Sequence, residues 1–195
     1  MADASNKTIF DSSKITVIFI LGGPGAGPPP IRIRELIRTC IREGTIVPME
    51  VTIKLLENAM RAAVEERDGK GLGWADGRGR FLIDGFPRKM DQALKFEEDV
   101  CVSGLTIFFT TTEEVMLKRL LVRGETSGRE DDNVESIKKR FRTYKDQTMP
   151  VIEHYRTQQK VAEIDSTGSV EEVHAKASVI INRLFAGEPT VNVTI

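Results

Sequence analysis

Glycines follow the first apolar run of the chain, in the segment Thr16-Val-Ile-Phe-Ile-Leu-Gly-Gly-Pro-Gly-Ala-Gly27. A short β-branched and apolar run that ends in glycines predicts a buried parallel strand followed by a tight turn. Such a turn lets successive backbone N–H groups converge on one point, where they can bind phosphate oxygens. The sequence therefore predicts a phosphate-binding loop made of Gly22, Gly23, Pro24, Gly25, Ala26 and Gly27.

This loop contains only half of the full phosphate-loop pattern, which is G-x-x-x-x-G-K-[ST]. Gly22 and Gly27 occupy the two glycine positions, but Pro28 stands where the pattern has lysine, and Pro29 and Pro30 follow. The lysine would reach the β- and γ-phosphates, and prolines have no N–H to donate at a helix start. We therefore expect phosphate binding and any phosphoryl transfer to be strongly weakened.

Asp84 and Arg88 are the next candidates for phosphate chemistry. Asp84 ends the short apolar run Phe81-Leu-Ile, where a carboxylate can hold Mg²⁺ or a metal-bound water. The alternative for Asp84 is a turn or helix cap. Arg88 follows a Gly-Phe-Pro turn, and its guanidinium offers phosphate two parallel hydrogen bonds.

Four further arginines can neutralise phosphate charge if the fold brings them together. Taken singly, each is better explained as a solvated surface charge. Taken together, they suit a loose phosphoryl-transfer transition state, whose charge is spread over equatorial oxygens. The first two are spaced i, i+4 and share a helical face, and the set is Arg119, Arg123, Arg129 and Arg140.

Composition limits the class of protein. The 195 residues suit a single domain, and a net charge of −1 argues against a nucleic-acid binder. The apolar run Ile15 to Leu21 is too short for a membrane span and lacks the flanks of a signal peptide. Cys40 and Cys101 form neither a disulfide framework nor a metal pattern. We expect a soluble intracellular protein.

Apolar periodicity predicts alternating strands and helices, hence an α/β fold with a mostly parallel sheet. Ligands of such sheets bind beyond the carboxyl ends of the strands, where Gly22, Asp84 and Asp165 would cluster. We expect tails at 1–14 and 187–195 and a polar loop at 124–131. Strands are expected at 15–21, 81–84, 105–109 and 160–165, and helices at 33–41, 48–64, 91–102, 112–121, 134–155 (kinked at Pro150) and 170–184.

Two stretches resemble the nucleoside monophosphate kinases. Phe81-Leu-Ile-Asp-Gly-Phe-Pro-Arg88 with Gln92 is similar to their monophosphate-binding strand and turn. Arg119-Leu-Leu-Val-Arg-Gly-Glu-Thr-Ser-Gly-Arg-Glu-Asp-Asp-Asn133 is similar to a short lid of the UMP/CMP kinase (uridylate kinase) branch. No Asn-Lys-x-Asp guanine motif occurs, which argues against a GTPase-like switch. The resemblance implies a phosphate-loop NTPase-like three-layer sandwich, one domain over 1–195, with a degenerate loop at 15–30, a monophosphate-arm remnant at 31–66 and a lid at 124–132.

The resemblance also implies a role for each candidate. ATP and Mg²⁺ would be the cofactors, UMP or CMP the acceptor, with AMP left open, and the protein a cytoplasmic or nuclear monomer of pyrimidine nucleotide metabolism. Asp84 would organise Mg²⁺. The residues that bind ATP would be Gly22 to Gly27, Arg119 and the backbone at Gly168. Those that bind the acceptor would be Ile46, Val47, Gly85, Arg88, Gln92, Arg129 and Arg140, and the catalytic cations Arg88, Arg123, Arg129 and Arg140.

The family pattern is interrupted after Gly27. The family continues there with Lys-Gly-Thr, a helix, a second strand and a helical arm, whereas this chain passes through three prolines to a helix like the end of that arm. A parallel crossover needs a dozen or more residues, so one strand and its helix are expected to be missing. Such a loss next to the first strand would leave an apolar sheet edge open. A degenerate, catalytically inactive binding protein and an error in exon joining both explain this gap.

Overall fold

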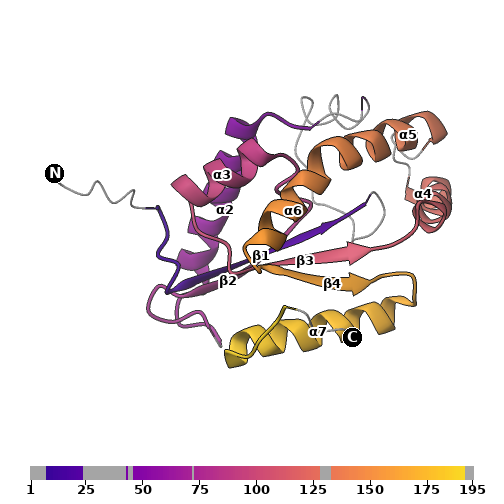
Figure 1. Ribbon diagram of the computed structural model, residues 1–195. Coiled ribbons are helices and arrows are strands. Elements are labelled where there is room, and N and C mark those ends of the chain that lie inside the picture. Colours follow the sequence, from indigo (N-terminus) through magenta and orange to yellow (C-terminus); the bar gives the residue numbers. More distant parts are fainter. Residues whose placement is uncertain (1–7, 24–42, 44–45, 72, 128–132, 192–195) are drawn as a thin grey trace.

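The computed structural model describes residues 8–23, 43, 46–71, 73–127 and 133–191. Strands and helices alternate in it, as the periodicity predicts (Figure 1). The strands are β1 (Ile15–Gly22), β2 (Gly79–Asp84), β3 (Leu105–Thr110) and β4 (Val161–Asp165). The helices are α2 (Met49–Arg67), α3 (Met90–Asp99), α4 (Glu113–Ser127), α5 (Val134–Thr143), the π-helical turn η1 (Tyr144–Thr148), α6 (Met149–Thr157) and α7 (Val170–Ala186). The expected helix at 33–41 lies outside the described residues.

The four strands form one parallel sheet with the order β2-β1-β3-β4, which confirms the α/β prediction. The registers align Ile20 with Asp84 and Gly22 with Phe109. The open apolar edge expected after the loss lies at β2, whose Leu82 is 61% exposed, and not beside the first strand, because β1 has a neighbour on each side. In the described part of the chain, β2 and β4 are the two edges of the sheet.

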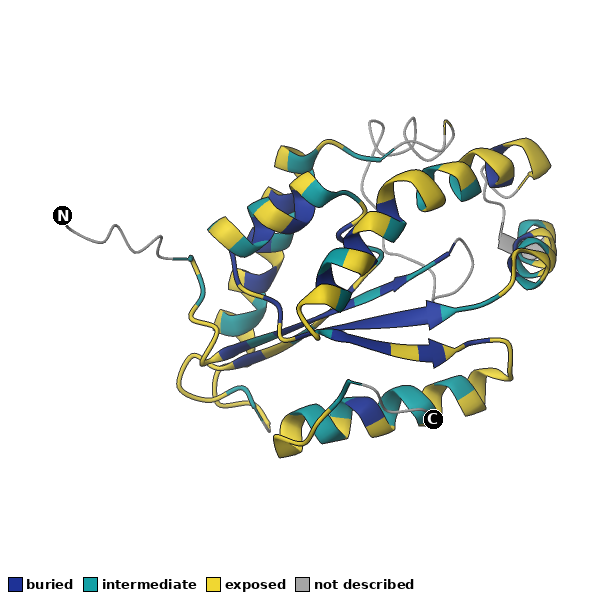
Figure 2. Cartoon of the chain, viewed as in Figure 1, coloured by how far each residue is buried: buried dark blue, intermediate teal, exposed yellow. Residues whose placement is uncertain are grey.

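Alternation along β1 builds a core on each face of the sheet. Val17, Phe19 and Leu21 lie in the core shared with α2, α3 and α6, whereas Ile18 lies in the core beneath α7. Phe19 makes edge-to-face contacts with Phe96, at a centroid distance of 5.5 Å. Figure 1 shows the resulting three layers, with α7 the only labelled helix on its side of the sheet, and Figure 2 shows the buried strands between the layers. No described helix is long and apolar enough to cross a bilayer.

Helical periodicity predicts that Val51, Val134 and Val170 lie on the apolar faces of their helices, and this expectation needs correction. Val134 and Val170 begin α5 and α7 and are 49% and 80% exposed, because a first helical turn can project beyond the elements below it. On α2, Ile53 and Met60 are buried, whereas Val51 is 38% exposed. The polar loop expected at 124–131 begins later, since α4 continues through Gly124 to Ser127.

The kink expected at Pro150 has a different origin. The chain passes from α5 through the π-helical turn η1 before α6 begins, so the interruption precedes the proline. Pro150 itself stands in the first turn of α6, where its missing N–H costs little. The widened turn ends at Thr148, whose hydroxyl donates to the Arg88 carbonyl at 3.1 Å.

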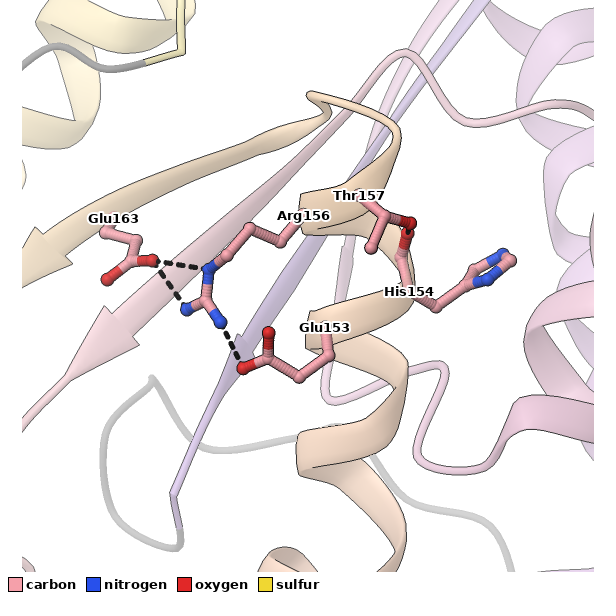
Figure 3. Close-up of polar contacts among 5 residues, drawn as sticks. All are labelled: Glu153, His154, Arg156, Thr157 and Glu163. Carbon is pink, nitrogen blue, oxygen red and sulfur yellow. Dashed lines mark hydrogen bonds and ion pairs between the residues drawn. The ribbon is translucent and has the colours of Figure 1, made fainter.

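An exposed ion-pair network joins α6 to the edge strand β4 (Figure 3). The Arg156 Nε and Nη2 atoms donate to Glu163 Oε1 at 3.0 and 2.6 Å, and Nη1 also pairs with Glu153. Thr157 donates its hydroxyl to the His154 carbonyl at 2.7 Å. Because these side chains are partly exposed, we expect the network to orient α6 more than to stabilise the fold.

Glu97 should contribute more to stability, because its partners are buried. The Ser103 backbone N–H and hydroxyl both donate to Glu97 Oε1, at 2.9 and 2.5 Å, and Ser103 is 2% exposed. Glu97→Ala is expected to lower the free energy of unfolding by about 2 kcal/mol, since it leaves these donors unpaired. Urea denaturation measures the change. Glu98→Ala, at an exposed neighbour, should stay within about 0.5 kcal/mol, and equal effects of the two substitutions would contradict the prediction.

Candidate functional site

The candidate site lies at the carboxyl ends of the strands. The chain leaves β1 toward β2 on one side, whereas it leaves β3 toward β4 on the other. The adjacent strands β1 and β3 therefore define a switch in strand order, where ligands of parallel sheets bind. The glycine turn after β1 and the helix α4 after β3 both begin there. Three of the candidate residues, Gly22, Asp84 and Arg88, come from this edge.

Gly22 ends β1, and Gly23 follows it buried against α4. A Cβ atom added to Gly23 would lie 2.0 Å from Met116 Sδ and 2.9 Å from Met116 Cε. Any larger residue at this position therefore requires the end of the Met116 side chain to move. No pattern in the sequence indicated Met116 as the contact that sets this turn. The remaining loop residues, Pro24, Gly25, Ala26 and Gly27, lie outside the described part of the chain, as do the prolines at 28–30.

Gly23→Ala is expected to destabilise the fold by about 1–3 kcal/mol, because the buried Met116 must move. Thermal or urea unfolding of the variant measures this cost. Combining it with Met116→Ala should recover at least about 1 kcal/mol relative to the sum of the single changes, because the clash is removed. Additive effects would contradict a direct contact.

Arg88 is held at the turn after β2. Its Nε donates to the Gly85 carbonyl at 2.7 Å, and its backbone N–H donates to Gln92 Oε1 at 2.8 Å. Gly85 has φ +71°, and a Cβ there would lie 2.8 Å from Arg88 Nη2. The left-handed backbone thus favours glycine at this position, and a Cβ there would also require the Arg88 guanidinium to move. The Thr148 hydroxyl also donates to the Arg88 carbonyl. No pattern in the sequence indicated Thr148 as a contact of this turn.

Gln92 joins this turn to the start of α2. It is 2% exposed, and its Nε2 donates to the Val47 carbonyl at 3.2 Å. A cavity of about 170 Å³ opens beside it, lined by Ile46, Val47, Pro48, Met49, Glu50, Lys89, Asp91 and Gln92. The structure therefore brings together Ile46, Val47 and Gln92, three of the residues expected around an acceptor base. A larger cavity of about 450 Å³ between α2 and α3 is lined by neither Arg88 nor Gln92, so we assign it no role.

Asp84 lies beside Arg88 at the same edge. Desolvation by the surrounding protein raises the pKa of the Asp84 carboxyl, and the Arg88 guanidinium opposes the shift. Asp165, by contrast, accepts from the Thr167 backbone N–H and hydroxyl at 2.9 and 3.0 Å, which lowers its pKa and commits it to its own turn. Of the two acidic strand ends, Asp84 is therefore the better candidate to meet a cation.

The single carboxylate of Asp84 suits Mg²⁺ better than a cation whose ligands all come from protein side chains. Within the described ranges, no three His, Cys, Asp or Glu side chains gather as a metal site. Mg²⁺ commonly takes only one or two carboxylates and completes its shell with water and substrate phosphates. A single carboxylate at the mouth of the site is consistent with that mode of binding.

The predicted ATP-side and transfer arginines lie on α4 and α5. Arg119 Nη2 donates to the Gly168 carbonyl at 3.1 Å, so these two residues, both expected to bind ATP, contact each other. Arg123 lies one turn further along α4, and Arg140 lies near the end of α5; both are partly buried. Arg129 lies outside the described residues.

Comparison with known proteins identifies one matching family and several similar nucleotide kinases. The model of a family described as adenylate kinase matches residues 32–160. A UMP-CMP kinase of Lentinula edodes is 57% identical over 211 residues, covering 94% of this chain and 92% of that protein. A uridylate kinase of Saccharomyces cerevisiae is 42% identical over 201 residues, covering 89% and 94%. A UMP-CMP kinase of Danio rerio is 36% identical over 201 residues, covering 87% and 98%.

These comparisons also bear on the gap expected after Gly27. The alignments with the Lentinula and Saccharomyces proteins span 211 and 201 residues, although the whole chain has 195. Each must therefore include positions of the relative with no counterpart in this chain. The family match begins at residue 32, directly after the three prolines. Both observations agree with an internal loss near residues 28–30.

Proposed function

Because the chain belongs to the adenylate kinase family, we propose that it transfers the γ-phosphoryl group of ATP to a pyrimidine nucleoside monophosphate, UMP or CMP, at a rate limited by Pro28. The relatives named UMP-CMP kinase and uridylate kinase support this acceptor. The observation that carries the proposal is buried Gln92, fixed between the Val47 carbonyl and the Arg88 backbone N–H beside a cavity.

In the proposed complex, Gln92 faces the pyrimidine base and Arg88 binds the acceptor phosphate. A side-chain amide can donate to and accept from a base edge, and burial makes an unmatched base costly. The guanidinium of Arg88 lies at the turn beyond β2, tethered through Nε to Gly85, so its terminal nitrogens can form a fork on phosphate. This division between an amide for the base and a cation for the phosphate supports a nucleoside monophosphate as the ligand.

The transfer itself requires positioning and charge neutralisation rather than a covalent step on the protein. We assign Arg123, Arg129 and Arg140 to the transferred phosphoryl group. Arg119 and the Gly168 backbone would border the adenine, and the turn from Gly22 would hold the ATP phosphates. Mg²⁺, when bound, neutralises charge on the β- and γ-phosphates, and Asp84 would hold the ion or its water.

A second function, nucleotide binding without turnover, is favoured by one observation, the proline in the lysine position. Pro28 leaves the γ-phosphate without the ammonium group that the full loop supplies. The acceptor side depends on Arg88 and Gln92 instead, so it remains able to bind a monophosphate. We place either function in pyrimidine nucleotide metabolism, in the cytoplasm or nucleus.

Two measurements on the full chain test the proposal. Calorimetry with UMP, CMP and AMP should give tighter binding for the two pyrimidine nucleotides. A sensitive assay of UDP formation from ATP, UMP and Mg²⁺ should then give slow turnover. Binding without any turnover would select the second function, and no binding of any monophosphate would refute both.

A further inference from the structure

The outer edge of β2 carries backbone groups that do not pair with β1. The Gly79 and Gly85 backbone N–H groups donate to carbonyls of Lys14 and Ile20, at 3.2 and 2.9 Å. Because these groups alternate direction along a strand, those of Arg80, Leu82 and Asp84 point away from β1. Among the residues that the structure describes, no strand pairs with that side of β2.

The same edge carries an exposed apolar side chain on the α7 side of the sheet. Leu82 is 61% exposed, whereas Ile18, directly beside it in the β1–β2 register, is 2% exposed. Ile18 is covered from the core beneath α7, and α7 is the only labelled helix on that face in Figure 1. Leu82 thus lies in the same cross-strand row as the buried Ile18 but is itself exposed at the edge of the sheet.

We propose that two copies of this chain pair through β2, antiparallel about a twofold axis at Leu82. In that register, in the chain without bound nucleotide or Mg²⁺, Leu82 meets Leu82 of the second copy, and Arg80 meets Asp84 of the second copy twice. These three positions are the ones whose backbone groups point outward, so they form the hydrogen-bonded pairs of the new ladder. On the opposite face, Phe81 meets Ile83 of the second copy.

The charge pattern favours a second copy over an unrelated strand. A twofold interface must be self-complementary, and the sequence Arg-Phe-Leu-Ile-Asp satisfies this with one cation and one anion equally spaced from its centre. Opposite charges directly across a ladder stabilise it, and like charges destabilise it. The Arg80 guanidinium carbon also lies 3.8 Å from the ring centroid of Phe185 of α7, which holds the guanidinium on this face. The resemblance to monophosphate kinases implied a monomer, and the open edge leads to a different inference for this chain.

Charge-reversal substitutions test the proposal. The dimer dissociation constant is measured by sedimentation velocity on the full chain without nucleotide. The native chain should be dimeric at micromolar concentration. Arg80→Asp and Asp84→Arg should each raise the dimer dissociation constant at least about tenfold, because each creates two like-charge pairs. An equimolar mixture of the two variants should form a dimer again, because both cross-strand pairs are then opposite in charge.

Arg142→Asp is the matched control, since Arg142 is exposed on α5, and it should leave the dimer intact. If the reversals fail to fold, Leu82→Lys, checked by circular dichroism, should give a folded monomer. A native chain that remains monomeric at about 100 μM would overturn the proposal. A dimer that neither the reversals nor Leu82→Lys weakens would also overturn it, because another surface would then carry the interaction. None of these outcomes depends on turnover.

Discussion

Restoring Lys-Gly-Thr after Gly27, together with the segment that follows it in the Lentinula relative, is expected to raise UDP formation by at least about a thousandfold. The native chain has Pro28, Pro29 and Pro30 at this point. It therefore lacks the lysine ammonium, the hydroxyl that meets Mg²⁺ and backbone N–H donors at the helix start.

The size of this effect follows from the number of contacts regained. Each charge-assisted hydrogen bond contributes about 1.5–3 kcal/mol, and about 1.4 kcal/mol is a tenfold change in rate. Three regained contacts that strengthen in the transition state thus correspond to about three to six decades. On the acceptor side, Arg88 and Gln92 already lie together, so this estimate counts only contacts to ATP and Mg²⁺.

A matched control separates the chemistry from the repair of the fold. The same restored chain with alanine in place of the new lysine regains the missing residues without the ammonium group. We expect it to bind UMP like the fully restored chain but to turn over at least about a hundredfold more slowly. Equal rates for the native and restored chains in a coupled assay would show that another group holds the ATP phosphates.

Much of this fold could be predicted because its strands are nearly continuous apolar runs. Val17, Phe19 and Leu21 serve one face and Ile18 the other, so β1 must be apolar throughout, and its glycine end locates the turn. The same reasoning located Asp84 and Arg88 after β2. Local sequence is sufficient there, because burial on both faces and a sharp turn leave strong patterns.

Features that depend on which elements become neighbours could not be predicted. The open edge of β2 follows from strand order, and no residue within β2 indicates that order. The fit of Gly23 against Met116 joins a turn to a helix more than ninety positions later. The π-helical turn that brings Thr148 to Arg88 is likewise set by packing, since Tyr144 to Thr148 has no distinctive composition.

Arg88→Ala is expected to weaken UMP binding by the native chain by about a hundredfold. The guanidinium would form two charge-assisted bonds to the acceptor phosphate, each contributing about 1.5–3 kcal/mol, partly offset by water that replaces it. Titration calorimetry measures the affinity directly, so the prediction holds whether or not the chain turns over. Arg88→Lys should recover only part of the loss, because an ammonium group cannot form the fork.

Arg142→Ala removes the same charge from an exposed position on α5 and should change UMP affinity by less than about twofold. Unfolding curves of both variants are needed, because Arg88 also donates to Gly85. If Arg88→Ala keeps both its stability and its UMP affinity, the phosphate lies elsewhere. If Arg88→Ala keeps its stability and loses affinity for UMP but not for uridine, the acceptor phosphate is bound at this turn. Recognition of the base is then assigned to the amide of Gln92.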